Sequence, residues 1–346
     1  MKKFVQKSFT FITTLLISSL LIQQLVFLIF RKINVGELGV INKIMQGEIN
    51  SEILICGSSR SFVGIDPQTI SKITGLKTFN ISLNGSRLGI QLPVLKSYLE
   101  HNKKPKILLQ EVGFESLTPT QHIFAPYKYL PYLHENELYQ GLLKIDPDLW
   151  IQKYIPLSNF IYFNTDFQKL FIEDLFLTGK NENDYLKNGY EPHSNAWTIN
   201  EEKFIGQPQN IYFYQSALDK DILLEIIELC KELNIKLVLI TTPVYKKIER
   251  IKTNSKIMIE TYSRIANQYN VSYFNYFNLP MSEEKEYFYN FTHLAKNGAK
   301  EFSKILSQDL IKNNTYQIPF EKVLSKPYVN KILNLKYYEV IHQFDK

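Results

Sequence analysis

Two short segments carry side chains that could form a nucleophilic site, and they lie near opposite ends of the chain. Residues 57–60, Gly-Ser-Ser-Arg, supply the hydroxyl of Ser59, and residues 290–293, Asn-Phe-Thr-His, supply the imidazole of His293. A serine hydroxyl is a weak nucleophile until an adjacent histidine accepts its proton. Each segment also has a purely structural interpretation, as a serine-rich turn that caps a helix or as the start of a helix. Chemistry at Ser59 therefore requires a fold that brings His293 to it.

Predicted strands direct both segments to the same place. Residues 51–57 form a short apolar run that ends at a glycine, which is typical of a buried parallel strand, and Ser59 follows directly. His293 lies between a predicted strand at 271–276 and a predicted helix at 295–312. Ligands of parallel sheets bind at the carboxyl ends of the strands, where both segments would lie. We therefore expect Ser59 and His293 to be neighbours at one sheet edge.

The surrounding sequence alternates between strand and helix patterns. The predicted strands are 51–57, 77–82, 106–112, 235–243 and 271–276, and the predicted helices are 67–74, 88–102, 216–233, 255–269 and 295–312. Such alternation implies a parallel sheet with helices on both faces. We therefore predict a three-layer α/β/α fold with a five-stranded parallel sheet, in a domain that spans 33–313.

The alternation stops between about 114 and 215. This stretch is rich in Tyr, Phe, Pro and Asn, and its hydrophobic periodicity is weak. Loops of this length inside compact domains are usually lids or have structure of their own. We predict an insertion that folds over the ligand-binding edge of the sheet. Residues 314–346 are expected to form an irregular C-terminal tail.

Residues 8–30 contain no charged side chain and are rich in Leu, Ile and Phe. As a helix, about 23 residues span roughly 34 Å, enough to cross a hydrocarbon core of about 30 Å. A signal peptide would have a shorter apolar region followed by small residues, whereas Arg31 and Lys32 follow here. We therefore predict an uncleaved membrane anchor at 1–32. Gln23 and Gln24, inside the run, are mildly unfavourable in lipid and could mark a helix–helix contact.

The charges that flank the anchor indicate its orientation. Lys2, Lys3 and Lys7 precede the apolar run, and this slight positive bias favours a cytoplasmic N-terminus. We expect a single-pass protein of the cytoplasmic membrane whose globular domain lies on the extracytoplasmic side.

Composition excludes several other classes of protein. Hydrophobic residues at 45% and charged residues at 21% are typical of a globular domain. The net charge of +6 is spread along the chain without a basic run, which argues against a nucleic-acid partner. Cys56 and Cys230 lie in apolar patterns without metal-ligand spacing, so we expect buried free thiols.

The order of these segments resembles the SGNH (GDSL) hydrolase superfamily over about 51–311, apart from the insertion. In that family the nucleophile ends a Gly-Asp-Ser block after the first strand, which matches Ser59. Residues 80–85, Asn-Ile-Ser-Leu-Asn-Gly, resemble the block whose glycine N–H joins that of the nucleophile in the oxyanion hole, which matches Gly85. The last block is Asp-x-x-His-Leu, and it matches 290–294 with His293 as the general base. The resemblance implies a flavodoxin-like sheet and a reaction that needs no metal or organic cofactor.

Two positions depart from the family pattern. Residues 111–115 lack the asparagine that donates to the oxyanion, and Asn290 replaces the aspartate that orients the histidine. An amide oxygen can still hold an imidazole, but an Asp-to-Asn exchange in a serine triad can cost about 10⁴ in turnover. The alternatives are a slow enzyme that uses Asn290, a substitute acid, or a relative without turnover. The candidate substitute acids are Glu283, Glu284 and Glu286.

The Gly-Ser-Ser-Arg variant and the N-terminal span also resemble two branches of the superfamily. These are the polysaccharide O-acetylation proteins of the alginate type and the D-alanyl transfer proteins of teichoic acid systems. The resemblance implies acyl transfer or deacylation on a cell-surface glycan, beside a multi-spanning membrane O-acyltransferase. Arg60 and Arg87 could hold an anionic group of the substrate or could be structural ion-pair partners. The alternative functions are an inactive glycan-binding or scaffolding subunit and, third, a membrane-structural role without a site.

Overall fold

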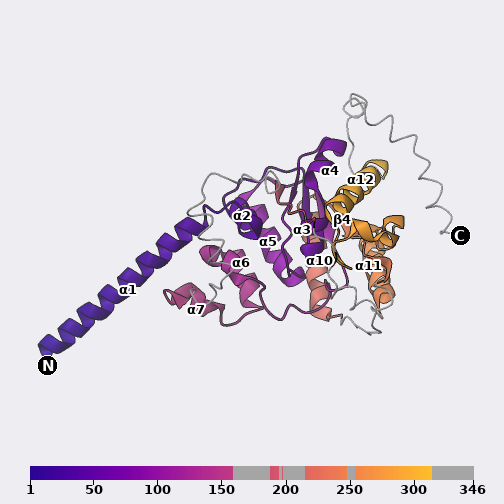
Figure 1. The fold of residues 1–346 in the computed structure, drawn as a ribbon. Coiled ribbons are helices and arrows are strands. Elements are labelled where there is room, and N and C mark those ends of the chain that lie inside the picture. The colour runs from indigo at the N-terminus through magenta and orange to yellow at the C-terminus, as the bar shows by residue number, and fades with distance from the viewer. Residues whose placement is uncertain (159–187, 195–196, 198–214, 248–253, 314–346) are drawn as a thin grey trace.

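The centre of the structure, a computed structural model, is a five-stranded parallel sheet of order β2-β1-β3-β4-β5. Figure 1 shows the helices that surround it and labels β4. The structure describes residues 1–158, 188–194, 197, 215–247 and 254–313. The strands are β1 (Ile53–Cys56), β2 (Thr78–Asn80), β3 (Ile107–Glu111), β4 (Lys236–Thr241) and β5 (Ser272–Asn275). Every predicted strand is present, and each is shorter at both ends because its flanking residues leave the ladder for turns. The predicted α/β fold with a parallel sheet is confirmed.

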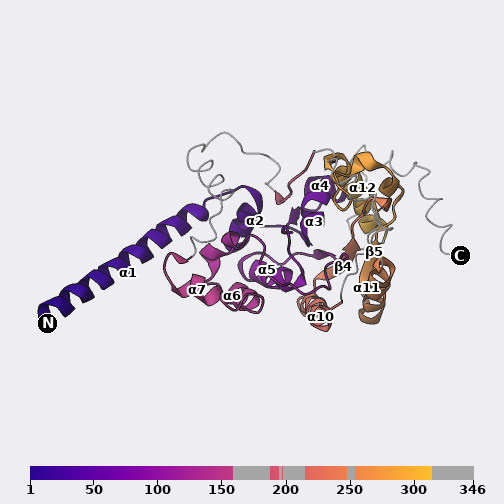
Figure 2. The ribbon, with the colours of Figure 1, turned by 60° about the horizontal axis from the view of Figure 1, so that its bottom comes forward.

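Helices cover both faces of this sheet (Figure 2). On one face lie α4 (Pro67–Thr74) and α12 (Lys296–Lys312); on the other lie α5 (Leu88–His101), α10 (Ala217–Glu232) and α11 (Ser255–Tyr269). Successive strand side chains point to opposite faces. Leu54 of β1 accordingly packs with α5 and α10, and Ile55 packs with α4 and α12. Both are fully buried, and burial of each side chain contributes roughly 1.5–3 kcal/mol.

Two further helices flank the first strand; the first was not predicted, and the second follows the serine-rich turn that was considered as a helix cap. Helix α2 (Gly36–Met45) packs Ile41 and Ile44 into the core beside α5. Helix α3 (Ser59–Gly64) begins directly after β1, where Ser58 caps it by accepting a hydrogen bond from the N–H of Arg60. The short turn of small residues after β1 therefore becomes a helix start.

The described part of the predicted insertion has regular structure. It contains the 3-10 turns η1 (Pro126–Lys128) and η2 (Leu130–Tyr132) and the helices α6 (Asn136–Leu143) and α7 (Leu149–Tyr154). Helix α6 packs against α5, where a Cβ on Gly141 would lie 2.4 Å from Pro93. The remainder of the insertion, at 159–187, 195–196 and 198–214, and the predicted tail at 314–346 lie outside the described residues.

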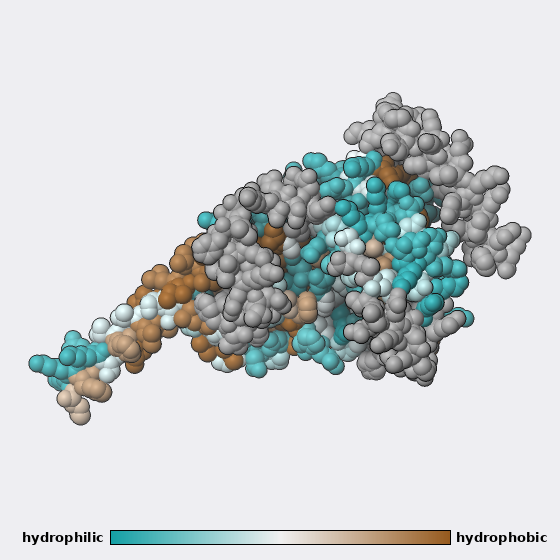
Figure 3. Space-filling view, viewed as in Figure 1, coloured by the Kyte–Doolittle hydropathy of each residue, from teal (hydrophilic) through white to brown (hydrophobic). Residues whose placement is uncertain are grey.

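Helix α1 (Lys2–Phe30) is a single helix of 29 residues, long and apolar enough to cross a membrane. It extends away from the domain, and most of its surface is hydrophobic (Figure 3). Its C-terminal end is fixed to the domain, because the amide of Asn42 donates to the carbonyls of Phe30 and Ile33, each at 2.7 Å. The two cysteines, Cys56 and Cys230, are buried and unpaired, as the sequence predicted.

Candidate active site

Ser59 and His293 meet at the carboxyl edge of the sheet. Ser59 is the first residue of α3, and His293 lies between η7 (Lys285–Tyr287) and α12. The Oγ of Ser59 lies 2.8 Å from the Nε2 of His293, although 234 positions separate the two residues in sequence. This distance is within the hydrogen-bond reach required of a nucleophile and its base. The structure therefore brings together the two residues that the sequence placed at one edge.

Asn290 holds the other side of the imidazole. Its Oδ1 lies 3.0 Å from the Nδ1 of His293 and also accepts the backbone N–H groups of Thr292 and His293, each at 2.9 Å. The hydroxyl of Thr292 lies 2.9 Å from the same Nδ1 and donates to Asn290 Oδ1 at 3.2 Å. Because an amide oxygen only accepts hydrogen bonds, a hydrogen bond between His293 and Asn290 places the proton on Nδ1. The Nε2 lone pair then faces the hydroxyl of Ser59. The Asn290 contact thus favours the tautomer needed for a base, without supplying a negative charge.

A stack of aromatic rings adds to the positioning of His293. The ring of Tyr289 stacks on His293 with centroids 5.4 Å apart, and it also stacks on His193 at 4.8 Å. The carbonyl of His193 accepts the N–H of Lys296 at 2.7 Å, which ties this segment to the start of α12. Tyr289 directly precedes the predicted segment 290–293, but ring stacking leaves no signal in the sequence, and His193 lies 100 positions before His293.

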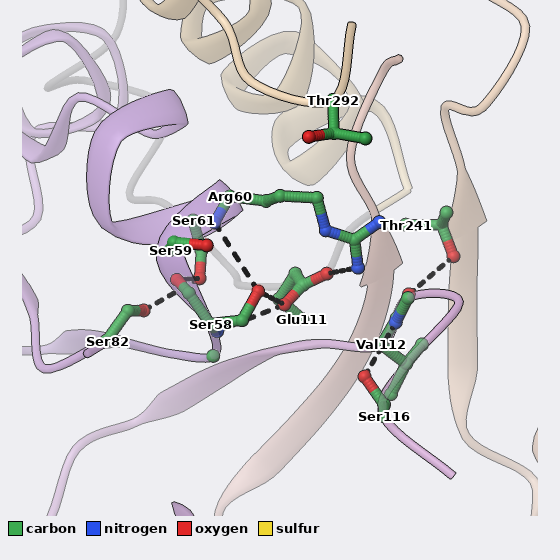
Figure 4. Close-up of polar contacts among 12 residues, drawn as sticks. Ser58, Ser59, Arg60, Ser61, Ser82, Glu111, Val112, Ser116, Thr241 and Thr292 are labelled. Atoms are coloured by element: carbon green, nitrogen blue, oxygen red, sulfur yellow. Dashed lines mark hydrogen bonds and ion pairs between the residues drawn. The ribbon is translucent and has the colours of Figure 1, made fainter. Parts of the chain in front are cut away.

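A buried carboxylate supports the turn that carries Ser59. Glu111, at the end of β3, accepts the N–H of Ser58 at 3.1 Å and its hydroxyl at 2.8 Å, and it forms an ion pair with Arg60 (Figure 4). The Glu111 side chain is fully buried, where an ion survives only with such partners. A Cβ on Gly113 would overlap the guanidinium of Arg60, so only glycine leaves room for this pair.

Arg60 and Arg87, which were predicted either to bind an anionic substrate group or to form structural ion pairs, both lie in ion pairs. Arg60 is engaged with Glu111, which is the structural alternative for this residue. Arg87 donates to the carbonyl of Pro119 at 2.7 Å and lies 3.3 Å from the more exposed Glu115. Both side chains still line the cavity at Ser59, so a role in substrate binding remains a prediction.

Gly85 lies in a second supported loop. Its φ of +64° belongs to the left-handed region that favours glycine, and a Cβ there would lie 2.7 Å from Phe124. The preceding N–H, that of Asn84, donates to Glu37 of α2 at 2.5 Å. Lys128 forms an ion pair with the same Glu37 oxygen at 2.8 Å. Burial lowers the pKa of Lys128, and the adjacent Glu37 carboxylate opposes that shift.

The N–H groups of Ser59 and Gly85 were predicted to form an oxyanion hole. Among the described residues, neither N–H donates a hydrogen bond to another protein group. A cavity of about 240 Å³ opens beside them. Its lining includes Ser59, Arg60, Gly85, Arg87, Phe114, Phe124 and His293. The nucleophile, the base and the two candidate donors therefore border one small space.

The remaining sequence expectations concern the two departures from the family pattern. Of the three candidate substitute acids, Glu283 forms an ion pair with Lys246 at 2.5 Å on the exposed surface. Asn290 contacts Nδ1 of His293, the position at which an orienting acid would act. In the segment 111–115, Glu111 supports the Ser59 turn and the N–H of Gly113 donates to Ser116 at 2.8 Å.

Comparisons with known proteins identify structural relatives at low similarity. No protein-family model matches the chain, and no curated protein matches it significantly. One similar solved structure is a provisionally named platelet activating factor from Streptococcus pneumonia, with 14% identity and a TM-score of 0.40 over 89% of this chain and 99% of that one. Another is a provisionally named acylhydrolase from Bacteroides fragilis NCTC 9343, with 11% identity and a TM-score of 0.34 over 76% and 88%. At these levels the functions of those proteins do not transfer to this chain.

Proposed function

We propose that this chain is a membrane-anchored serine acyltransferase or esterase that acts on acyl groups of a cell-envelope polysaccharide. The observation that carries the proposal is the 2.8 Å contact between Ser59 Oγ and His293 Nε2. A second support is the Asn290 contact, which leaves Nε2 free of its proton. The unoccupied N–H groups beside the cavity supply the donors that an acyl-transfer intermediate requires.

The proposed reaction proceeds in two steps. In the first, Ser59 Oγ attacks the acyl carbonyl while its proton passes to His293 Nε2, and the N–H groups of Ser59 and Gly85 stabilise the oxyanion. The intermediate collapses to an acyl-serine ester, and the leaving alcohol takes the proton from Nε2. In the second step, water or a sugar hydroxyl attacks the ester while His293 accepts its proton. Ser59 then leaves with that proton, and the acyl group is released as an acid or transferred.

Asn290 sets the expected rate of this reaction. The imidazolium that forms in each step faces an amide oxygen instead of a carboxylate, so its positive charge receives less stabilisation. Exchange of the acid for an amide in a serine triad lowers turnover by about 10⁴. The proposed enzyme is therefore slow, with an acyl-serine ester that persists long enough to be observed.

The setting of the proposed reaction is the cell envelope. Helix α1 has the length and composition of a membrane span, and the lysines at its start favour a cytoplasmic N-terminus. We place the domain on the extracytoplasmic side, with a cell-surface glycan as substrate and a multi-spanning O-acyltransferase as partner. No nucleic-acid partner is proposed.

A second candidate function is a glycan-binding or scaffolding subunit without turnover. It is favoured by the amide at Asn290 and by the absence of an asparagine at 111–115. Such a subunit would keep the cavity and the Ser59–His293 contact but would not form a covalent intermediate.

A serine-directed fluorophosphonate separates the two functions. The full chain in detergent should be labelled, and Ser59→Ala should abolish the label. Ser194→Ala is the matched control, because Ser194 is exposed and lines a different depression; its labelling should equal that of the original chain. Absence of label in a folded chain, or label undiminished in Ser59→Ala, would contradict the nucleophile and favour the binding subunit.

A further inference from the structure

Helix α7 presents an exposed apolar surface that the site does not use. Leu149 and Gln152 face the domain and are buried, whereas Trp150, Tyr154 and Ile155 are 47%, 65% and 45% exposed. Large apolar side chains gathered on one surface are typical of contacts with a membrane or another molecule. Helix α7 and the residue that follows it therefore have an inner side packed on the domain and an outer side that stays exposed in the described part of the structure.

The segment that directly follows α7 contacts the C-terminal half of helix α1. The Oε1 of Gln23 accepts the backbone N–H of Leu157 at 2.7 Å, and Gln23 is only 6% exposed. Gln23 precedes Arg31 by eight positions, so this contact lies about 12 Å along the helix from the first charge after the apolar run. In Figure 3 the hydrophobic surface of α1 continues onto the adjoining edge of the domain, where Figure 1 places α6 and α7.

Several polar groups at the end of α7 are hydrogen-bonded internally, which lowers the cost of contact with lipid. The hydroxyl of Ser158 donates to the carbonyls of Ile151 and Ile155 at 3.0 and 2.7 Å. The N–H of Ile155 donates to Ile151 at 2.8 Å. The ammonium of Lys153 lies 3.6 Å from the ring centroid of Tyr139, and its long side chain can reach the headgroups.

We propose that Trp150, Tyr154 and Ile155 insert into the lipid interface of the leaflet next to the domain. Trp and Tyr favour this depth, and interfacial helices bury their apolar face about 5–10 Å into the headgroup–acyl boundary. The Gln23–Leu157 contact places the segment after α7 at a comparable depth. The occupant is lipid because the surface is continuous with α1, and the inference rests on the proposed span. The domain then has a second attachment, which fixes the height of the Ser59 site above the membrane.

The two tryptophans of the chain allow a direct test. Trp197→Phe leaves Trp150 as the sole tryptophan, and Trp150→Phe is the matched control that leaves Trp197. The indole of Trp197 donates to the carbonyl of Phe288 at 2.8 Å, in the part of the domain that carries α12. Each full-length variant is reconstituted into phosphatidylcholine vesicles with brominated acyl chains, and tryptophan fluorescence is measured after flotation.

The expected result is strong bromine quenching and blue-shifted emission of Trp150, with little quenching of Trp197. Flotation of the protein without quenching of Trp150 would overturn the α7 contact while leaving the span intact. Blue-shifted but unquenched Trp150 would indicate a protein neighbour and would also overturn it. Failure of the chain to float with the vesicles would contradict the span itself, and the inference with it.

Discussion

Two buried or nearly buried carboxylates support the two loops that border the candidate site, and they belong to different parts of the molecule. Glu111 ends β3 at the centre of the sheet and receives donors from Ser58 and Arg60, next to Ser59. Glu37 begins α2 and receives the N–H of Asn84 and the ammonium of Lys128, next to Gly85.

This difference shows that the proposed oxyanion hole depends on two separate supports. The Ser59 donor is held by the sheet, because β3 pairs with both β1 and β4. The Gly85 donor is held by the segment that joins α1 to the domain. On the proposed mechanism, a change where α1 joins the domain should therefore alter transition-state stabilisation without moving the nucleophile. The comparison is tested by removing each support in turn.

The largest effect is expected at His293, which contacts the nucleophile directly. His293→Ala removes the base and should lower hydrolysis of p-nitrophenyl acetate by at least about 10³-fold, with the fold intact by circular dichroism. Activity that remains within about tenfold of the original chain would show that the ester is cleaved elsewhere.

Removal of the Glu111 carboxylate, the support next to Ser59, should mainly affect the stability of the fold. Glu111→Gln leaves the charge of Arg60 without its carboxylate, and loss of one member of a buried pair costs about 3–5 kcal/mol. Addition of Arg60→Met should recover part of that loss, because no uncompensated charge then remains. Thermal unfolding of the full chain in detergent measures the loss of stability in Glu111→Gln and its partial recovery in the double variant. Equal unfolding temperatures for Glu111→Gln and the original chain would refute a structural role for the pair.

Removal of Glu37, the support next to Gly85, should mainly affect catalysis. Glu37→Ala frees the N–H of Asn84 and should lower kcat more than it raises KM, by less than the 10²–10³-fold lost with an oxyanion donor itself. Glu48→Ala, an exposed residue of the same segment, is the matched control and should leave both constants unchanged. A purely structural Glu37 would lower the amount of folded protein but not kcat.

A smaller change, of opposite sign, is expected at Asn290. Asn290→Asp places a carboxylate beside Nδ1 of His293 and should raise turnover of the same ester by about tenfold, because the imidazolium gains a counter-charge. The gain is smaller than the roughly 10⁴ lost in a complete triad, because the segment 111–115 still lacks the asparagine that donates to the oxyanion. Unchanged or lower turnover would indicate that no imidazolium forms at His293 during the reaction, and would contradict its role as general base.

Asp219 is a third buried carboxylate, with fewer hydrogen-bond donors than Glu111 or Glu37. Its substitution should give the smallest effect of those considered, a change in unfolding temperature. Its Oδ2 has no hydrogen-bond partner among the described residues, and burial raises the pKa of Asp219. A carboxyl whose pKa is raised by folding contributes stability below its unfolded pKa, and that stability is lost as pH rises through the folded pKa. Asp219→Asn should therefore unfold at a higher temperature than the original chain at neutral pH, with the gain reduced or reversed near pH 4. A pH-independent difference would contradict this origin.

The sequence allowed prediction of those parts of the site that depend on strand order. In a parallel sheet with alternating helices, the residues that follow each strand lie at one edge. This places Ser59 and His293 together independently of the side chains elsewhere in the chain. Helix α4 has the predicted bounds because Pro67 begins it and Gly75, with φ of +75°, ends it. Helix α11 likewise spans the predicted Ser255–Tyr269.

The remaining parts depend on contacts that leave no periodic signal. Glu37 and Lys128 are 91 positions apart, and neither lies in a motif, so their pairing arises only from tertiary packing. The stack of His193 on Tyr289 likewise joins segments that are distant in sequence. Helix α7 is too short for its hydrophobic pattern to be distinguished from a loop.

The central claim, that Ser59 is a nucleophile activated by His293, is tested most directly by trapping the acyl-serine ester. The full chain is mixed briefly with p-nitrophenyl acetate, quenched in acid and digested for peptide mass spectrometry. The account predicts one acetyl group on the Ser59 peptide, no acetyl there in Ser59→Ala, and a longer-lived adduct in the original chain than in Asn290→Asp. An acetyl group on another residue, or ester hydrolysis unchanged in Ser59→Ala, would contradict the account.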